Sequence, residues 1–390
     1  MFRPIISIYA LLASFIIVCM GNSLQTVLLP ARASLEHFSE VMIGAMMSGY
    51  YAGFIAGTFI CPWLIARVGH IRVFAASCAG ACAVMLIHAL FINPWIWIAL
   101  RVLYGLCLVH LFTVMESWLN SVGEKGTRGK ILSVYMIANF ISSFIGQMLF
   151  FVAPAKGFQL FSLCSILLSL SLVPLILSRI TPPPPVPLDS PEQYLGIRKL
   201  YRISPLGVIG ALTAGLMTGA YWGLTAVYIL GIGFSQNDVA WFMAASLLGG
   251  LVAQWPLGAL FDRNRRYAIM LSLALITIAA IAITSMAFWD MQKAPFGIVF
   301  LLVFGIIFGT GFHPFYSLCM AHTNDFVPAG SYVHASAGLQ LTQSIGAAAG
   351  PLIASFLMHA MGNRMLYMYI ALLSGSFILY RLLIGRRQNT

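Results

Sequence analysis

Long apolar segments alternate with short polar ones along the whole chain, and their lengths predict its fold. Twelve segments, each of about 19 to 26 residues, are long enough to cross roughly 30 Å of hydrocarbon as helices. They cover residues 5–29, 41–66, 73–92, 95–115, 131–153, 158–178, 206–231, 239–260, 267–288, 295–317, 334–358 and 365–383. In hydrocarbon the backbone must pair its own polar groups, and the segments lack the two-residue alternation of barrel strands. We therefore predict an all-α membrane protein with twelve transmembrane helices.

The chain is too apolar for a water-soluble fold, with 60% hydrophobic residues, 8% charged residues and a mean hydropathy of +0.92. Its formal net charge of +11 would suit a nucleic-acid partner, but the basic residues sort by membrane side. With the N-terminus inside, sixteen fall in cytoplasmic segments and four on the opposite side, namely Arg32, Lys156, Lys293 and Arg364. The positive charge therefore sets the topology: we expect both termini in the cytoplasm and no nucleic-acid partner.

A proline-rich segment, residues 179–204, divides the chain into two halves of six predicted spans each. Its prolines, which include the run Pro182–Pro185, predict an extended linker. We expect one six-helix bundle over residues 1–178 and a second over residues 205–390.

The two halves also repeat each other. At an offset of 196 residues Gly249 superposes on Gly53, and at an offset of 204 residues Gly309 superposes on Gly105. Parallel six-helix repeats that flank a site at the membrane midplane are one architecture of secondary transporters, whose halves rock around the substrate. The repeat therefore favours two pseudo-symmetric bundles.

A short basic loop follows the second span of each half, and both loops resemble the loop signature G-x-x-x-D-R-x-G-R-R of the major facilitator superfamily. The second loop matches the signature at Gly258, Asp262, Arg263, Arg265 and Arg266 but lacks the internal glycine. The first loop matches it at Arg67, Gly69 and Arg72, and it has Ala66 in place of the aspartate and Pro62 in place of the first glycine.

Two further strings, Glu116-Ser-Trp-Leu-Asn120 and the stretch from Tyr316 to Asp325, are similar to the YcaD-like bacterial branch of this superfamily. The resemblance covers nearly the whole chain. It implies the fold of two six-helix bundles and a multi-pass protein of the bacterial cytoplasmic (inner) membrane, but it implies no substrate.

The basic loop of the first half suggests a gate. Arg67 and Arg72 lie at the predicted cytoplasmic ends of spans two and three, where guanidinium groups can pair with a carboxylate on a neighbouring helix. Glu116, at the same end of span four, is the expected partner. Such a latch would hold the cytoplasmic side closed and break on inward opening.

The loop of the second half has its own carboxylate. Asp262, beside Arg263 and Arg266, is placed to cap the N-terminus of a neighbouring helix such as span eleven. The alternative for both loops is that their arginines only set topology or contact lipid headgroups.

Arg101 is the one basic residue expected inside a span, about six residues and some 9 Å beyond Trp95. The resemblance places it at the superfamily's conserved arginine of span four. A charge at this depth is costly and usually functional. Glu116 lies about 22 Å away along the helix and cannot neutralise it. We expect Arg101 to bind an anionic group or to take part in proton coupling, unless it only bonds a neighbouring helix end.

Other polar and aromatic residues on the predicted central helices complete the candidate site: Asn22, Gln25, His110, Tyr221, Trp222, His313 and Tyr316. Glu116 is the default candidate for a proton-carrying group, but its position at the inner end of span four favours a latch or structural role. The histidines are often packing residues in such helices, and Tyr221 and Trp222 would alternatively suit an interfacial belt.

These features predict a secondary active transporter that moves a small molecule by rocker-type alternating access coupled to protons. Arg101 alone favours an anionic or zwitterionic substrate. The alternative is a transporter-like membrane receptor or assembly factor. We expect no enzyme activity, because nucleotide-binding, zincin and nucleophile-elbow motifs are absent, and no cofactor or metal site, because the seven cysteines lack metal-ligand spacing. We expect a monomer in contact with membrane lipid.

Overall fold

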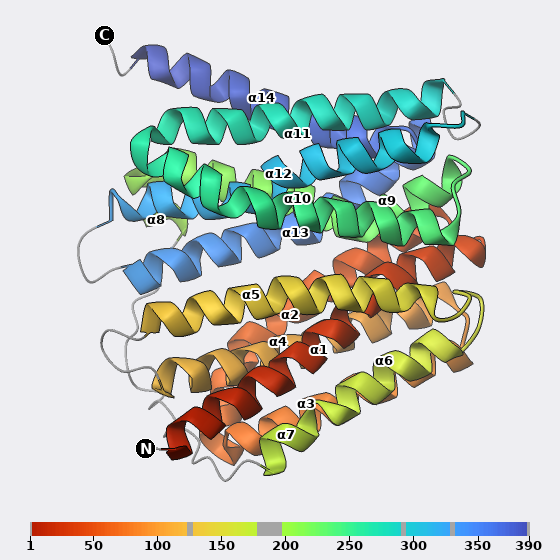
Figure 1. Ribbon diagram of the computed structural model, residues 1–390, viewed down its shortest axis with the longest axis vertical. Helices are drawn as coiled ribbons and strands as arrows, with labels where there is room; N and C mark the ends of the chain where they lie inside the picture. Colours follow the sequence, from red (N-terminus) through yellow and green to blue (C-terminus); the bar gives the residue numbers. More distant parts are fainter. Residues whose placement is uncertain (1, 123–127, 178–196, 290–293, 328–331, 388–390) are drawn as a thin grey trace. The chain divides into compact units, whose positions relative to one another are not determined.

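The computed structural model confirms the all-α membrane fold. It describes residues 2–122, 128–177, 197–289, 294–327 and 332–387. In this part of the chain, twelve helical spans are long and apolar enough to cross a membrane, and they coincide with the twelve predicted segments (Figure 1).

The first half of the chain forms seven α-helices and one short 3-10 helix. These are α1 (Phe2–Leu35), α2 (Glu40–Val68), α3 (His70–Leu90), α4 (Pro94–Val122), α5 (Arg128–Met148), η1 (Leu149–Phe151), α6 (Gln159–Leu170) and α7 (Leu172–Leu177). The sixth predicted span is thus two helices. Ser171 separates them, and its hydroxyl donates to the Leu168 carbonyl at 2.6 Å, a backbone contact that competes with regular helix bonding.

The second half forms seven helices. They are α8 (Ile197–Ile203), α9 (Pro205–Gly231), α10 (Gln236–Arg263), α11 (Arg265–Phe288), α12 (Gly297–Asn324), α13 (Tyr332–Met361) and α14 (Met365–Arg387). Local sequence fixes several starts: Ser204 caps α9 ahead of Pro205, and Ser235 forms a capping box with Asp238 at α10. The short α8 was not predicted. It buries Leu200 against Val208 and Leu339.

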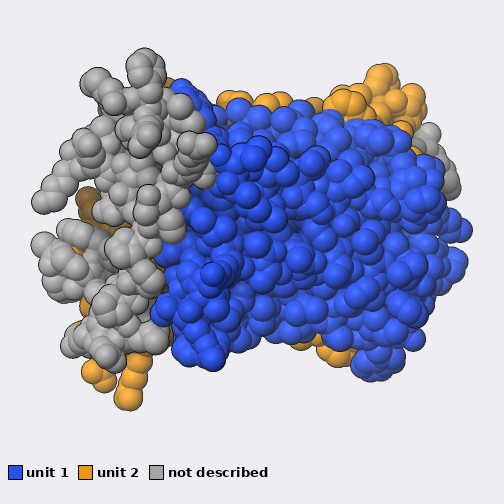
Figure 2. Space-filling model, turned by 90° about the horizontal axis from the view of Figure 1, so that it is seen from below, with its two compact units in different colours: residues 1–37, 49–191 blue, residues 38–48, 192–390 orange. Residues whose placement is uncertain are grey.

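The chain divides into two compact units, coloured separately in Figure 2. Unit 1 holds residues 1–37 and 49–191, and unit 2 holds residues 38–48 and 192–390. The division between them falls in the proline-rich segment. Of the expected linker, residues 179–196 lie outside the described residues. Residues 38–48, which include the first turns of α2, group with unit 2, which the hydropathy pattern did not indicate.

Glycines bring helix backbones into contact in unit 1. A side chain added at Gly53 would meet the backbone of Val102, and one added at Gly105 would meet the carbonyl of Tyr50. The two glycines therefore face each other's helix, and α2 and α4 approach more closely than any larger residues would allow.

Unit 2 contains the same crossing between α10 and α12. A side chain at Gly249 would meet the backbone of Ile306, and one at Gly309 would meet that of Ser246. The α10 residues lie 196 positions after their α2 counterparts, and the α12 residues lie 204 positions after those of α4, the offsets expected from the sequence. The repeat is therefore present in the contacts of the backbone as well as in the sequence.

A second repeated crossing joins α1 to α5 and α9 to α13. Gly146 packs on the backbone of Met20, and Gly350 packs on that of Leu216, again with offsets of 204 and 196 residues. Both units thus share one skeleton of glycine-mediated crossings.

These crossings predict a large cost for adding one methyl group. We expect Gly105→Ala to lower the free energy of unfolding by about 1–3 kcal/mol, because its side chain would overlap the Tyr50 backbone, which cannot swing away. Thermal unfolding of the purified protein in detergent measures this effect. Gly258→Ala is the matched control: Gly258 is also helical but has open space around it, and alanine there should be neutral or stabilising by up to about 1 kcal/mol. Equal melting temperatures for the two variants would contradict the importance of the crossing.

Candidate functional site

Arg101 lies against tyrosine rings within unit 1. Its guanidinium carbon is 4.5 Å from the ring centroid of Tyr50 and 5.9 Å from that of Tyr104. The glycine crossing positions Tyr50, because Gly105, one turn from Arg101, packs on the Tyr50 backbone. Tyr104 follows Arg101 by three residues and therefore shares its helix face. The packing of Arg101 against these two rings thus results from helix α4 and from its glycine crossing with α2.

The charge of Arg101 is buried without an acid. The side chain is 2% exposed, and its Nε and Nη1 atoms have no hydrogen-bond partner among the described residues. Removing a cation from water costs several kcal/mol, whereas a desolvated cation–π contact returns about 2 kcal/mol. The tyrosines therefore offset only part of the cost, and the edge of the guanidinium lacks an acceptor among the described residues.

Two buried glutamine amides add polar groups to unit 1. Gln25 on α1 and Gln147 on α5 are each 0% exposed, and neither the oxygen nor the nitrogen of either amide has a partner in the described part of the chain. Each buried polar group left unpaired costs about 1–3 kcal/mol. An amide offers both donors and an acceptor, so these two side chains could bind uncharged polar groups of a ligand.

Sequence reasoning found only part of this set. It selected Arg101, Gln25 and Asn22, whose Oδ1 atom is also buried and without a partner in the described residues. It missed Tyr50, Tyr104 and Gln147. The spacing of Tyr104 from Arg101 was a usable signal, as was an amide in the apolar fifth span, whereas Tyr50 is placed by packing that the sequence does not show.

In unit 2 the structure brings Tyr221, Trp222 and His313 together. The ring centroid of His313 is 6.4 Å from that of Tyr221 and 6.3 Å from that of Trp222, and its Nε2 atom is 3.4 Å from Ser246 Oγ. Tyr221 also stacks on Phe308 at 5.3 Å. This aromatic cluster suits an apolar or planar part of a ligand.

The repeat allows the two units to be compared position by position. At the same offsets Tyr50, Arg101 and Tyr104 correspond to Ser246, Gly305 and Phe308. A side chain at Gly305 would meet the ring of Phe242. Where unit 1 places a cation, unit 2 therefore places a phenylalanine ring.

Two other candidates lie elsewhere. His110 Nδ1 is 3.3 Å from Ser77 Oγ on α3, so the histidine joins two helices of unit 1, which fits its packing interpretation. Tyr316 packs against the apolar cluster of α8, α9 and α13 that includes Leu200 and Leu339, rather than beside His313.

At the gate expected in the first half, Glu116 has a different partner from the predicted one. Glu116 is exposed and accepts a hydrogen bond of 2.8 Å from Tyr135 Oη on α5, instead of pairing with Arg67 or Arg72. Arg67 lies over the ring of Trp63 at 5.3 Å, and Arg72 is exposed. A phenol about two helical turns along α5 was closer to Glu116 in space than the loop arginines, and the sequence carried no signal for this.

In the second basic loop, an arginine forms an ion pair with a carboxylate other than Asp262. Arg265 Nε is 3.1 Å from Asp325 Oδ2, which joins the start of α11 to the end of α12. Asp262, Arg263 and Arg266 are exposed, and within the described residues no capping contact of Asp262 is present. In the sequence, Asp325 stood out only as the last residue of the stretch from Tyr316 that resembles the YcaD-like branch.

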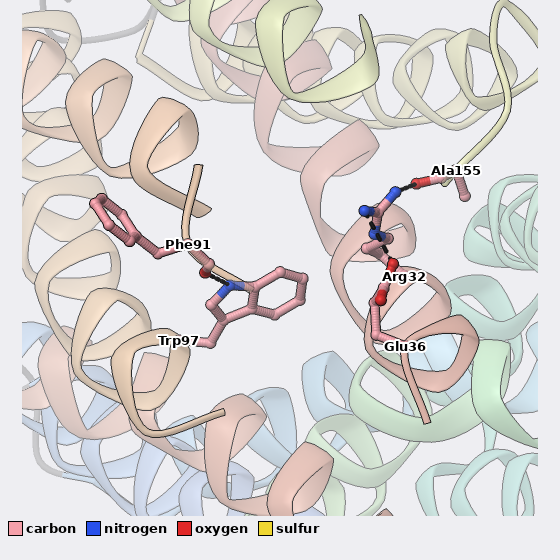
Figure 3. Close-up of polar contacts among 5 residues, drawn as sticks. All are labelled: Arg32, Glu36, Phe91, Trp97 and Ala155. Carbon is pink, nitrogen blue, oxygen red and sulfur yellow. Dashed lines mark hydrogen bonds and ion pairs between the residues drawn. The ribbon is translucent and has the colours of Figure 1, made fainter. Parts of the chain in front are cut away.

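A second buried arginine, by contrast, is paired with an acid, although its Nε atom has no partner in the described residues. Arg32, 8% exposed at the end of α1, bonds Glu36 Oε1 at 2.9 Å and donates to the Ala155 carbonyl at 3.1 Å (Figure 3). Nearby in the same view, Trp97 Nε1 donates to the Phe91 carbonyl at 2.7 Å. Arg32 therefore joins elements of unit 1, whereas Arg101 joins none through hydrogen bonds.

The contrast between the two arginines predicts opposite effects on stability. We expect Arg101→Leu to unfold at the same temperature as the parent protein or a few degrees higher, because it removes an uncompensated buried charge. Arg32→Leu should be destabilised by about 3–5 kcal/mol, because it leaves Glu36 without its partner. Thermal unfolding in detergent without added ligand compares them, and a strong destabilisation by Arg101→Leu would show that Arg101 is structural.

Comparison with known proteins agrees with this architecture. The family model described as Major Facilitator Superfamily matches residues 11–323 and residues 207–389. The Uncharacterized MFS-type transporter YcaD of Shigella flexneri serotype 5b (strain 8401) is 27% identical over 396 residues, which cover 100% of this chain and 97% of that protein.

Two solved structures show the same fold at low sequence identity. The nucleoside transporter NupG has a TM-score of 0.81 and 12% identity over 99% of each chain. A POT family transporter in complex with 5-aminolevulinic acid has a TM-score of 0.78 and 12% identity over 98% of this chain and 96% of its own. Because the family match extends across both halves that the repeated crossings define, this chain belongs to the major facilitator superfamily and is a multi-pass membrane transporter.

Proposed function

We propose that this transporter is a secondary active carrier of a small anionic or zwitterionic solute, and that Arg101 binds the negative group. The observation that carries the proposal is a fully buried guanidinium that contacts Tyr50 and Tyr104 but no acid in the described residues. Gln25 and Gln147 would bind polar groups of the same solute. The excess of basic residues in the segments expected to be cytoplasmic supports a bacterial inner-membrane protein with both termini in the cytoplasm.

Rocker-type alternating access is supported by the division of α2. Its residues 38–48 group with unit 2, where Gly44 packs on Ser355 and on the Pro351 carbonyl of α13, and its residues from 49 onward group with unit 1. Any rocking of one unit against the other must therefore bend α2 or separate its first turns from α13. We propose that these turns separate.

Glu116 is the proposed proton carrier. It is a carboxylate on the membrane-spanning helix α4, it is exposed, and Tyr135 donates to it. A carboxylate on a membrane-spanning helix that accepts a hydrogen bond can take up and release a proton as access to the two sides changes. Its placement far along α4 from Arg101 separates proton transfer from solute binding.

The first experiment measures uptake into liposomes for a panel of carboxylates, zwitterions and neutral solutes, with and without an inward proton gradient. We expect Arg101→Gln to lower uptake of the transported anion or zwitterion by about 100-fold, because a charge-assisted contact is lost in a desolvated site. Glu116→Gln should transport without responding to the gradient, whereas Tyr135→Phe should still respond.

Lys156→Gln, which removes an exposed positive charge, is the control for charge alone and should retain full uptake. Full transport by Arg101→Gln would overturn the site. A parental response in Glu116→Gln would overturn proton coupling through this residue. Absence of uptake for every solute would favour the receptor or assembly-factor alternative.

A second experiment tests the separation of α2 from α13. Glu40 Oε2 and His359 Nδ1 are 3.5 Å apart, and both side chains reach solvent. In a cysteine-free background, a short thiol cross-linker between Glu40→Cys and His359→Cys should abolish transport, and each single variant treated alike should remain active. Undiminished transport by the cross-linked protein would show that these helices do not separate.

A further inference from the structure

Basic side chains gather at one end of unit 2, where α8 lies, α11 begins and α12 and α14 end (left in Figure 1). The described residues there include two carboxylates, and that of Asp325 is already paired with Arg265. The other carboxylate is that of Asp262. The basic residues are Arg198, Lys199, Arg202, Arg263, Arg265, Arg266 and Arg381. This end of the unit, which we call the basic end, therefore carries an excess of positive charge.

The helix α8 presents its basic residues on one fixed face. Leu200 is buried in a cluster with Val327, just beyond α12, which docks α8 on the unit. Arg198, Lys199 and Arg202 are exposed, and their spacings of three and four residues place them on the same side of the helix. No acid in the described part of the chain pairs with any of the three. The face therefore holds three cations whose charge the protein leaves uncompensated.

Arg266 and Arg381 bring two like charges together at the basic end. Arg266 lies in the first turn of α11 and is exposed, and Arg381 lies near the end of α14 and is half-buried. The charge of Arg266 acts on Arg381, so the two guanidinium groups are neighbours. Like charges at close range repel, and the repulsion is stronger where one of them is partly removed from water. An anion placed between the two would offset this cost.

The surroundings of this arginine pair suit a lipid better than a soluble anion. Leu382 and Leu383 follow Arg381 on α14, at the end of its membrane span, and both are exposed. Tyr267 follows Arg266 and is also exposed, as tyrosines often are at the level of lipid headgroups. A ligand that reaches both arginines would therefore meet charge on one side and apolar side chains on the other.

The excess of positive charge also selects among phospholipids. A zwitterionic headgroup carries an ammonium, which would be repelled by the surrounding arginines and would find Asp262 as the one carboxylate outside an ion pair in the described residues of this end. A headgroup with a phosphate and no ammonium meets no such repulsion. Basic clusters on the cytoplasmic side of a membrane protein bind anionic lipids for this reason.

We propose that the basic end of unit 2 binds an anionic phospholipid, whose phosphate bridges Arg266 and Arg381 while its acyl chains lie along the exposed leucines of α14. The three cations of α8 attract further anionic headgroups to the same surface. In the orientation proposed above, the lipid comes from the cytoplasmic leaflet. The assignment depends on unit 2 alone and stands whether or not Arg101 binds a solute.

Native mass spectrometry of the full chain, released from nanodiscs with equal amounts of phosphatidylglycerol and phosphatidylethanolamine, tests this proposal. We expect phosphatidylglycerol to be enriched among the retained lipids. Arg266→Gln should lower that enrichment about tenfold, the usual effect of losing one charge-assisted contact, and Arg266→Lys should restore part of it. Arg72→Gln is the matched control, because it removes an exposed arginine from the corresponding loop of unit 1, and it should leave the enrichment unchanged.

Thermal unfolding in detergent provides a second measurement. Without lipid, Arg266→Gln should melt at the same temperature as the parent protein or slightly higher, because it removes a repulsive charge. Added phosphatidylglycerol should raise the melting temperature of the parent protein and of Arg72→Gln more than that of Arg266→Gln, because a ligand stabilises the state that binds it.

Three outcomes would overturn the proposal. Equal retention of the two lipids by the parent protein would exclude selection of an anionic headgroup. An equal loss in Arg266→Gln and Arg72→Gln would show a general attraction by cytoplasmic arginines instead of a site. Displacement of the lipid by soluble glycerol phosphate or polyglutamate at millimolar concentration would show that the basic end takes a soluble anion.

Discussion

Contact between helix backbones at glycines is the constraint on which the rest of the structure depends. Without a hydrophobic force to drive one apolar helix onto another in lipid, association depends on close van der Waals packing. The glycines of α2, α4 and α5 provide that packing in unit 1, as those of α10, α12 and α13 do in unit 2. The ring of Tyr50 beside Arg101 is placed by one of these contacts, so the candidate site depends on packing that contains no polar side chain.

The candidate site of unit 1 is costly to the stability of the fold. A buried guanidinium, two amides and a phenol without partners in the described residues represent a cost that a purely structural protein would remove by substitution. Arg32 shows that the same unit can pair a buried arginine with a carboxylate and a backbone carbonyl. Because Arg101 has no acid partner in the described residues, a ligand that pairs with it would offset the cost of burying its charge, which would strengthen binding.

Sequence reasoning recovered the spans because length and apolarity alone determine which segments can cross a bilayer. It could not recover the break at Ser171 or the short helix α8, which depend on a single hydroxyl contact and on packing of Leu200. For the site, the charge of Arg101 was informative by itself, whereas the position of Tyr50 beside it could be known only from how α2 and α4 cross. Glu116 was recognised, but its partner Tyr135 was not, because pairing across helices follows from distances in three dimensions.

The two units combine a shared set of glycine crossings with different side-chain chemistry. Gly305 and Phe242 occupy the place where unit 1 has its cation, yet the helices on either side meet through the same glycines. Chemistry and architecture are therefore separable in this fold: residues one turn away from a crossing can change freely while the crossing itself stays. A duplicated ancestor could in this way have kept its mechanics while one copy specialised in recognising charge and the other in recognising rings.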